Sequence, residues 1–393
     1  MKDEGTAQPL FRPGADDLHR IDADVAEISE IQRQLRDRHP DLKCLDRAAH
    51  QYQIAGSKVL LRVATELPDG FSGIGLFAPG IEHIGVGRLS TGLGTPHIES
   101  NPDFLGLRAS FLAASGQRVD FLAFNNPTSP SDNHRDLMHV LQGTADAASA
   151  RHPVPSYLAA EQARMNATLV KRMGPVKAEE TMAHIAEQSA RTTRSSTAYQ
   201  SYWTGVVEVN RTLGKFTLTP LSAENYERFL YPGERHLTQD WARRQASRDI
   251  TFRVYWISYL DERRTSLERL TQPWPETHKR FVGQLVFPRT DARSDDARLW
   301  AALAGEMGAN PGNWISNGCD SAREPSTEFG LARKFAYERS ARGRNALPLD
   351  AFKTALETGR IDDELAAELR RRREQKRRLG HVDRAPLRFF VVF

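Results

Sequence analysis

The chain has 393 residues, 39% of them apolar, which is enough for one large domain or two ordinary ones and excludes disorder throughout. The formal charge of +4 is too balanced to predict a nucleic-acid or acidic-membrane partner by itself. The cysteines are Cys44 and Cys319, without a C-x-x-C pair, which favours a reducing compartment over a disulfide framework. With no secretion-signal pattern at the start and no long apolar run, the sequence predicts a cytoplasmic protein without a membrane span.

The first half of the chain changes from a helical to a β-type pattern. Residues 16–36 carry apolar side chains at three- and four-residue spacing, which predicts an amphipathic helix in an N-terminal arm. From about residue 57 to 125 the pattern becomes one of short strands separated by Gly, Pro and Asn, which indicates an antiparallel sheet. These predicted strands are 59–63, 84–89, 107–112 and 119–124.

The second half contains helices before and after another group of strands. Residues 133–190 are helical in pattern, and 349–358 and 362–378 predict two helices near the end of the chain. The predicted strands between them are 202–209, 216–219, 251–259 and 281–287. Because strands and helices do not alternate strictly, we expect an α+β fold with a closed or strongly curved antiparallel β-barrel and surrounding helices.

A strongly basic run ends the last predicted helix. Residues 370–378 hold seven positive charges and one negative charge. Cations at a helix C-terminus interact favourably with the helix dipole, so a solvated helix end is the simpler interpretation. The alternative interpretation is that the run docks to an acidic partner or to nucleic acid. Of these two partners, we do not expect nucleic acid.

Four short motifs carry the candidate chemistry, although each alone has a simple structural interpretation. A lone histidine before a strand is ordinarily a surface or core residue, and Asn-Asn-Pro is usually a turn. Arg88 to Gly92 is either turn chemistry or a Gly-rich anion cradle, and a basic segment near residue 337 is compatible with a surface helix. The motifs are Arg47-Ala-Ala-His50, Arg88-Leu-Ser-Thr-Gly92, Asn125-Asn-Pro127, and Arg333-Lys-Phe-Ala-Tyr337 followed by Arg344.

Taken in order, these motifs resemble those of the haem catalase superfamily, which includes monofunctional catalases and the shorter catalase-related peroxidases and allene oxide synthases. That family has Arg-x-x-His, then Arg-Phe-Ser-Thr about forty residues later, an Asn-bearing turn, and Arg-x-Phe-x-Tyr with a further Arg. The resemblance covers residues 45–345, with residues 1–44 as an N-terminal helical arm and residues 346–393 as a C-terminal helical extension. It implies a catalase-like β-barrel.

The resemblance implies haem b, iron protoporphyrin IX, as the cofactor, with Tyr337 as the iron ligand. A phenol, with an ordinary pKa of about 10, binds ferric iron as phenolate only where cations stabilise the anion, and Arg333 is spaced to do so. Arg47, Arg88 and Arg344 are similar to the family's arginines that bind the haem propionates, a task suited to the guanidinium fork.

On the opposite side of the haem, the resemblance implies that His50 is the acid-base residue for cleavage of the peroxide O–O bond. Ser90 would then hold the second ring nitrogen of His50 and set its tautomer. Asn125 would donate a hydrogen bond to the peroxide, with Asn126 open for the same role if the alignment shifts by one residue.

Departures from the family pattern leave more than one function open. Residues 127–132 are Pro-Thr-Ser-Pro-Ser-Asp where catalases have paired phenylalanines, Gln51 to Gln53 replace the residues after the histidine, and Leu89 replaces a phenylalanine. A catalase-related peroxidase would use hydrogen peroxide or an organic hydroperoxide with a small organic reductant. The alternatives are a haem enzyme that rearranges or oxygenates an organic hydroperoxide or specialised metabolite, and a non-enzymatic role such as haem storage or a binding module that uses the basic C-terminal helix. The resemblance also implies a homo-oligomer, whereas zinc or serine hydrolase motifs find little support.

Overall fold

The computed structural model describes residues 11–38, 47–94, 97–148, 155–190, 195–210, 212–221, 233, 235–313 and 327–378. Both cysteines, the predicted domain boundary at residues 44 and 45, and residues 379–393 lie outside this part of the chain. All strand pairings within the sheet are antiparallel, in the order β5-β4-β3-β2-β1-β9-β8-β7-β6. An additional β5–β7 pairing closes the sheet into an eight-stranded barrel, with β6 paired to β7 alone.

The strands match most of the predicted ones and extend several of them. The predicted strand 202–209 is instead two strands, β5 and β6, of which β5 pairs with β4 and β7 and β6 pairs with β7. Successive side chains along a strand point to opposite sides of the sheet, so one side of each strand faces the barrel core and the other faces helices or the cavity described below. The strands are β1 (Gln53–Val63), β2 (Glu82–Thr91), β3 (Leu105–Leu112), β4 (Arg118–Phe124), β5 (Tyr202–Thr204), β6 (Val207–Val209), β7 (Thr212–Pro220), β8 (Ile250–Ser258) and β9 (Arg280–Phe287).

Aromatic side chains fill the barrel interior. Phe216 is fully buried and stacks on Phe77 with ring centroids 5.6 Å apart, and Trp256 tilts against it at 4.9 Å. Phe121 meets the same ring edge-on at 5.3 Å. Such pairs contribute beyond the area they bury, so the aromatic cluster is a major source of barrel stability.

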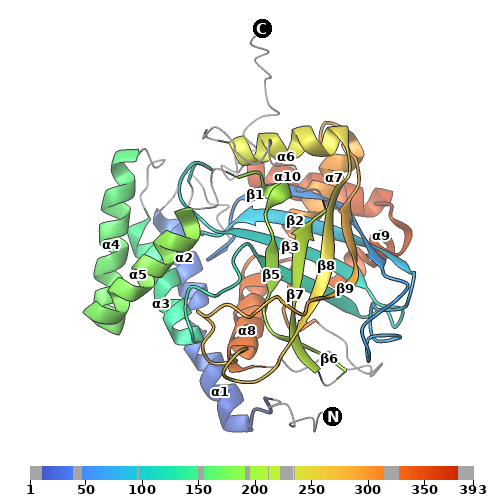
Figure 1. Cartoon of the computed structure of the whole chain (residues 1–393). Helices are drawn as coiled ribbons and strands as arrows, with labels where there is room; N and C mark the ends of the chain where they lie inside the picture. Colours follow the sequence, from blue (N-terminus) through green and yellow to red (C-terminus); the bar gives the residue numbers. More distant parts are fainter. Residues whose placement is uncertain are drawn as a thin grey trace, which may run out of the picture.

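Helices cover the barrel on several sides (Figure 1). Helices α7 and α9 pack against β1 to β3, α10 packs on α7, and α3, α4 and α5 form a group beside the barrel. The helices are α1 (Ala15–Asp24), α2 (Ile28–Arg38), α3 (His134–Ala147), α4 (Pro155–Met173), α5 (Pro175–Ala190), α6 (His236–Ser247), α7 (Asp295–Glu306), α8 (Glu328–Gly343), α9 (Lys353–Thr358) and α10 (Asp363–Arg378).

The predicted N-terminal helix is two helices, because the chain turns between Val25 and Ile28. Ile21, Val25, Ile28 and Ile31 are nevertheless all buried in one cluster with residues of α3 and α8. Both halves therefore bury the same apolar face, which is why the sequence pattern continues across the break.

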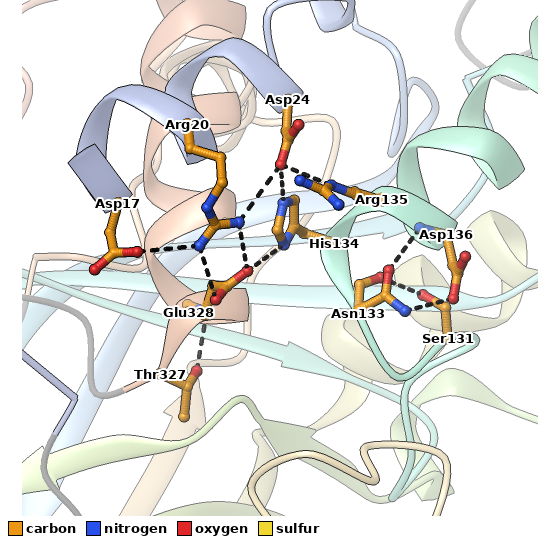
Figure 2. Close-up of polar contacts among 11 residues, drawn as sticks. Asp17, Arg20, Asp24, Ser131, Asn133, His134, Arg135, Asp136, Thr327 and Glu328 are labelled. Atoms are coloured by element: carbon orange, nitrogen blue, oxygen red, sulfur yellow. Dashed lines mark hydrogen bonds and ion pairs between the residues drawn. The ribbon is translucent and has the colours of Figure 1, made fainter. Parts of the chain in front are cut away.

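A network of ion pairs fixes the start of helix α8 (Figure 2). Glu328 contacts Arg20 of α1 at 3.2 Å and His134 of α3 at 3.4 Å, and His134 Nε2 lies 2.9 Å from Asp24. The hydroxyl of Thr327 caps the helix. Three helices far apart in sequence are therefore joined where α8 begins.

The basic end of α10 makes ion pairs within the chain. Arg371 and Arg372 contact Glu368, and Arg372 and Lys376 also reach Glu306 at the end of α7. The apolar side of α10 meanwhile buries Leu365 and Leu369. The basic run thus helps to hold α10 on α7, whose carbonyl end borders the cavity.

We expect Phe216→Ala to lower the free energy of unfolding by about 3–5 kcal/mol, because it removes a ring surrounded by other rings and leaves a cavity. Chemical denaturation measures this change. Phe281→Ala, at a side chain that is 40% exposed, is the matched control and should cost less than about 1.5 kcal/mol. Equal losses in the two variants would contradict a core centred on Phe216.

Candidate active site

A cavity of about 340 Å³ lies between the outer side of strands β2 to β5 and helix α8. Of the eight residues predicted from the sequence, Asn125 is the one that does not line it. The seven that line it are Arg47, His50, Arg88, Ser90, Arg333, Tyr337 and Arg344. The fold therefore brings together residues from positions 47 to 344 of the chain.

His50 has an unusual backbone conformation at the cavity wall. Its φ of 56° lies in the left-handed region, which is uncommon for a residue with a side chain. The backbone N–H of His50 donates to the carbonyl of Gly92 at 2.8 Å, and Arg88 donates to the carbonyl of His50 at 2.8 Å. Hydrogen bonds on both sides therefore hold the strained residue in place.

The contacts of the His50 ring assign its tautomer. Nδ1 lies 3.0 Å from the carbonyl oxygen of Thr91 and 3.3 Å from the hydroxyl of Ser90. A carbonyl only accepts hydrogen bonds, so Nδ1 carries the hydrogen and Nε2 is left as a proton acceptor. Among the described residues, none forms a hydrogen bond with Nε2.

Burial, with a contribution from the positive charge of Arg88, lowers the pKa of His50 to about 4. The imidazole is consequently neutral at pH 7. A neutral ring with a bare Nε2 facing a cavity is suited to act as a general base.

Gly106 of β3 makes room for the His50 ring. A Cβ atom at this position would lie 2.7 Å from both Nδ1 and Cε1 of His50. Gly106 pairs with Ser90 of β2, so the two strands present a flat surface and a hydroxyl beneath the same ring. The position of the imidazole thus depends on the absence of a side chain next to it.

Asn125 and Asn126 have different environments. The Asn125 side-chain oxygen accepts from the backbone N–H of Leu105 at 2.8 Å, and its amide donates to Gln200 at 2.7 Å. Asn125 therefore braces the turn after β4 and is directed away from the cavity, which Asn126 lines instead. Both ends of the Asn125 amide are thus engaged in bonds within the chain, and its predicted contact with peroxide stays a prediction.

Arginines gather around the carbonyl end of helix α7. Arg47 and Arg344 both donate to the carbonyl of Gly305, and Arg344 also donates to that of Met307 at 2.7 Å. Carbonyls at a helix C-terminus carry partial negative charge, which favours cations. The end of α7 thereby directs guanidinium groups to one side of the cavity.

Sequence analysis missed Arg108, which belongs to the same group. Its side chain is buried, faces Arg88 across strands β2 and β3, and donates to the carbonyls of Ala304 and Met307. Burial lowers the pKa of Arg108 to about 9, and Arg118 and Arg47 add to this effect. Its Nε has no acceptor among the described residues. A charged residue in the middle of an apolar strand was the available sequence signal.

Tyr337 projects from α8 on the wall opposite the barrel. The guanidinium of Arg333, one helical turn earlier, lies 5.9 Å from the centre of the Tyr337 ring. Arg333 itself packs over Gly205, where a Cβ would come within 2.7 Å of its Nη1. The predicted pairing of Arg333 with Tyr337 is therefore present as a cation–ring contact.

The lining of the cavity fits a flat dianionic cofactor of the haem type. The imidazole of His50 and the phenol of Tyr337 both line the cavity, and the arginine group with an unbonded Arg108 Nε supplies anion-binding donors. Within the described residues, no cluster of three or more His, Cys, Asp or Glu side chains could hold a bare metal ion. An iron ion here would need most of its ligands from such a cofactor.

Comparison with solved structures identifies the fold as that of the catalases. The chain superimposes on a fungal catalase with a TM-score of 0.56, at 17% identity, over 88% of this chain and 66% of the other. For catalase A from Saccharomyces cerevisiae the TM-score is 0.58 at 15% identity, over 91% of this chain and 70% of the other. For a bacterial catalase the TM-score is 0.57 at 17% identity, over 92% of this chain and 67% of the other. The chain thus spans about two thirds of the length of these catalases.

No protein-family model and no curated protein matches the sequence. The relationship is visible in the arrangement of the strands and helices, and the low identity limits it to the fold. No helix in the described part of the chain is both long and apolar enough to cross a membrane.

We expect Gly106→Ala to displace the His50 ring, because the new Cβ would overlap Nδ1 and Cε1. Once displaced from its hydrogen bonds and buried site, the imidazole should titrate nearer its ordinary value of about 6.5 than the wild-type value of about 4. NMR titration of the histidine resonances measures this shift. Gly305→Ala, where a Cβ meets only ordinary contacts, is the control, and an unchanged His50 pKa in Gly106→Ala would contradict the assigned geometry.

Proposed function

We propose that the chain is a haem-dependent oxidoreductase that processes peroxides, of the catalase-related peroxidase type. The observation that supports it most strongly is the neutral His50 facing Tyr337 across one cavity, with arginines along a third side. The catalase fold adds support, since the matched structures are catalases. Hydrogen peroxide or an organic hydroperoxide is the proposed oxidant, with a small organic reductant.

Haem b, when bound, would supply the redox-active iron that the peroxide oxidises. The oxygen of Tyr337 would hold that iron, and the positive charge of Arg333 would favour the phenolate form. Arg47, Arg344 and Arg108 would bind the propionates, because their donors converge beside the end of α7.

Arg88 has a second proposed role as a positioning residue. Its guanidinium donates to the carbonyls of His50 and Gln51 and to the side chain of Gln53, so it holds the segment that carries the imidazole. Any contact with a propionate would come in addition to these bonds. Replacement of Arg88 is therefore expected to disturb His50 as well as anion binding.

His50 would move the proton that peroxide cleavage requires. Nε2 would take the proton from one peroxide oxygen and return it to the other as the O–O bond breaks, while Thr91 and Ser90 hold Nδ1. The Asn126 amide, which lines the cavity, would donate to the oxygen on which charge develops. Asn125 would act indirectly, by fixing the turn that carries Asn126.

A larger organic substrate is the second candidate, and the extent of the cavity favours it. Besides Asn126, the cavity is lined by Thr128, Ser129, Leu270 and Lys215. This region offers polar and charged contacts that hydrogen peroxide does not need. Rearrangement or oxygenation of an organic hydroperoxide would use the same two residues, His50 and Tyr337.

The proposed ligation is tested by the absorption spectrum of the purified chain after haem is supplied. We expect wild type and the control Tyr255→Phe, which lies on β8 outside the cavity lining, to bind one haem per chain with a high-spin ferric phenolate spectrum. Tyr337→Phe should lose haem or show a different axial ligand. A wild-type spectrum in Tyr337→Phe would remove Tyr337 from the coordination site.

The role of His50 predicts a specific pH dependence. Because its pKa is lowered to about 4, the imidazole stays a base from pH 8 to pH 5, and the rate constant for reaction with peroxide should fall only as the pH approaches 4. Stopped-flow kinetics measures this profile. At pH 7, His50→Ala should be slower by roughly 10²–10⁴-fold.

His83→Ala is the matched control, since His83 is half-buried and its ring bonds the carbonyl of Leu76, but it does not line the cavity. A wild-type rate in His50→Ala, or a rate that already falls by half near pH 6.5, would contradict the proposed base.

A further inference from the structure

Lys215 is a buried cation in the wall of the cavity. It lies on β7, its side chain is only slightly exposed, and it lines the same cavity as His50. Its ammonium nitrogen sits 4.5 Å from the centre of the Trp274 ring. Among the described residues, none accepts a hydrogen bond from Nζ or forms an ion pair with it.

Sheet geometry places Lys215 on the cavity side of the barrel. Lys215 is two residues before Thr217, so both side chains leave the same face of β7. Thr217 pairs with Trp203, which in turn pairs with Phe124, and both aromatic residues line the cavity. The register of the strands therefore agrees with the position of Lys215 among the residues that line the cavity.

The arginine group is too distant to share a small ligand with Lys215. Strands β4 and β5 separate β7 from β3, which carries Arg108. With about 4.8 Å between neighbouring strands, Lys215 and Arg108 lie roughly 14 Å apart across the sheet. Two separate cationic regions thus border one cavity.

Burial alone lowers the pKa of Lys215 to about 8. The side chain is still mostly protonated at pH 7, so the cavity holds a charged ammonium group that is poorly hydrated. Glu208 of β6 also lines the cavity, 3.9 Å from Arg12, and Arg333 approaches over Gly205.

Burying an unpaired amine is costly, and the cost falls when an anion binds to it. The ammonium of Lys215 can donate three hydrogen bonds, of which the ring of Trp274 uses at most one. Trp203 and Leu270 supply apolar surface on the same part of the wall. This combination suits an organic molecule with an acidic end group.

We propose that Lys215, whose ammonium group lies against the ring of Trp274, forms a subsite for the carboxylate of a small organic acid that enters the cavity lined by His50. Such a ligand would be the organic hydroperoxide or the reductant of the proposed function, and the inference rests on that function for the chemistry after binding. A haem propionate carries the same carboxylate chemistry. The experiment must therefore separate the two sources.

Isothermal titration of the full chain, with and without supplied haem, tests the subsite. The probes are benzoate, phenylacetate and hexanoate, each compared with its neutral amide. We expect carboxylates to bind wild type at least about tenfold more tightly than the amides, and Lys215→Met to weaken carboxylate binding by about tenfold or more. Lys215→Arg, which keeps the charge, should retain binding.

Lys58→Met is the matched control, because Lys58 also lies over a tryptophan ring, that of Trp300, but does not line the cavity. It should bind the carboxylates as wild type does. Lys215→Met should also unfold at a temperature no lower than wild type, because the variant no longer buries an amine. A lower unfolding temperature would show that Lys215 serves stability instead and would overturn the proposal.

Haem titration of the same variants distinguishes the two sources of carboxylate. Retained haem affinity in Lys215→Met together with lost carboxylate binding supports an organic-acid subsite. Lost haem affinity in Lys215→Met would assign the lysine to a propionate and overturn the proposal, as would equal carboxylate affinity in wild type and Lys215→Met. A wild-type chain that binds no haem would refute the proposed function, while the haem-free titration would still decide the role of Lys215.

Discussion

The carbonyl end of helix α7 organises the positive charge of the cavity. Arg47, Arg108 and Arg344 reach the carbonyls of residues 304 to 307 from a segment before β1, from strand β3 and from the end of α8. Burying guanidinium groups is unfavourable unless their donors find acceptors, and the helix terminus supplies several at once. The same interaction fixes the distance between the barrel and α8, and hence the width of the cavity.

A second constraint acts on the barrel side, where His50 adopts a left-handed backbone conformation. The strain is tolerated because Gly92, Arg88 and Thr91 bond the backbone and ring of this residue. Gly106 leaves the space that the ring occupies. Such over-determined strain is typical of functional sites, where it positions a group for one task.

Sequence patterns predicted most of the barrel strands, and the order of the motifs predicted seven residues that line the cavity. They did not predict the turn at Val25, since the apolar face continues through it. They also could not distinguish Asn125 from Asn126, because which amide faces the cavity depends on bonds to Leu105 and Gln200 from other strands and loops.

Arg108 and Lys215 escaped prediction for a related reason. Each is one charged residue within a strand, and only the closure of the barrel shows which face it occupies. Charge on the outer face of a strand is ordinarily solvated. Here α8 and the segments around the cavity cover that face, so the two cations become part of a candidate site.

The central claim is that haem occupies the cavity between His50 and Tyr337. A crystal structure of the full chain after incubation with haem tests it most directly. The account predicts a porphyrin with its iron bound by the Tyr337 oxygen, His50 on the opposite face and the propionates on the arginines beside α7. A haem at another surface, or iron bound by a different side chain, would contradict it.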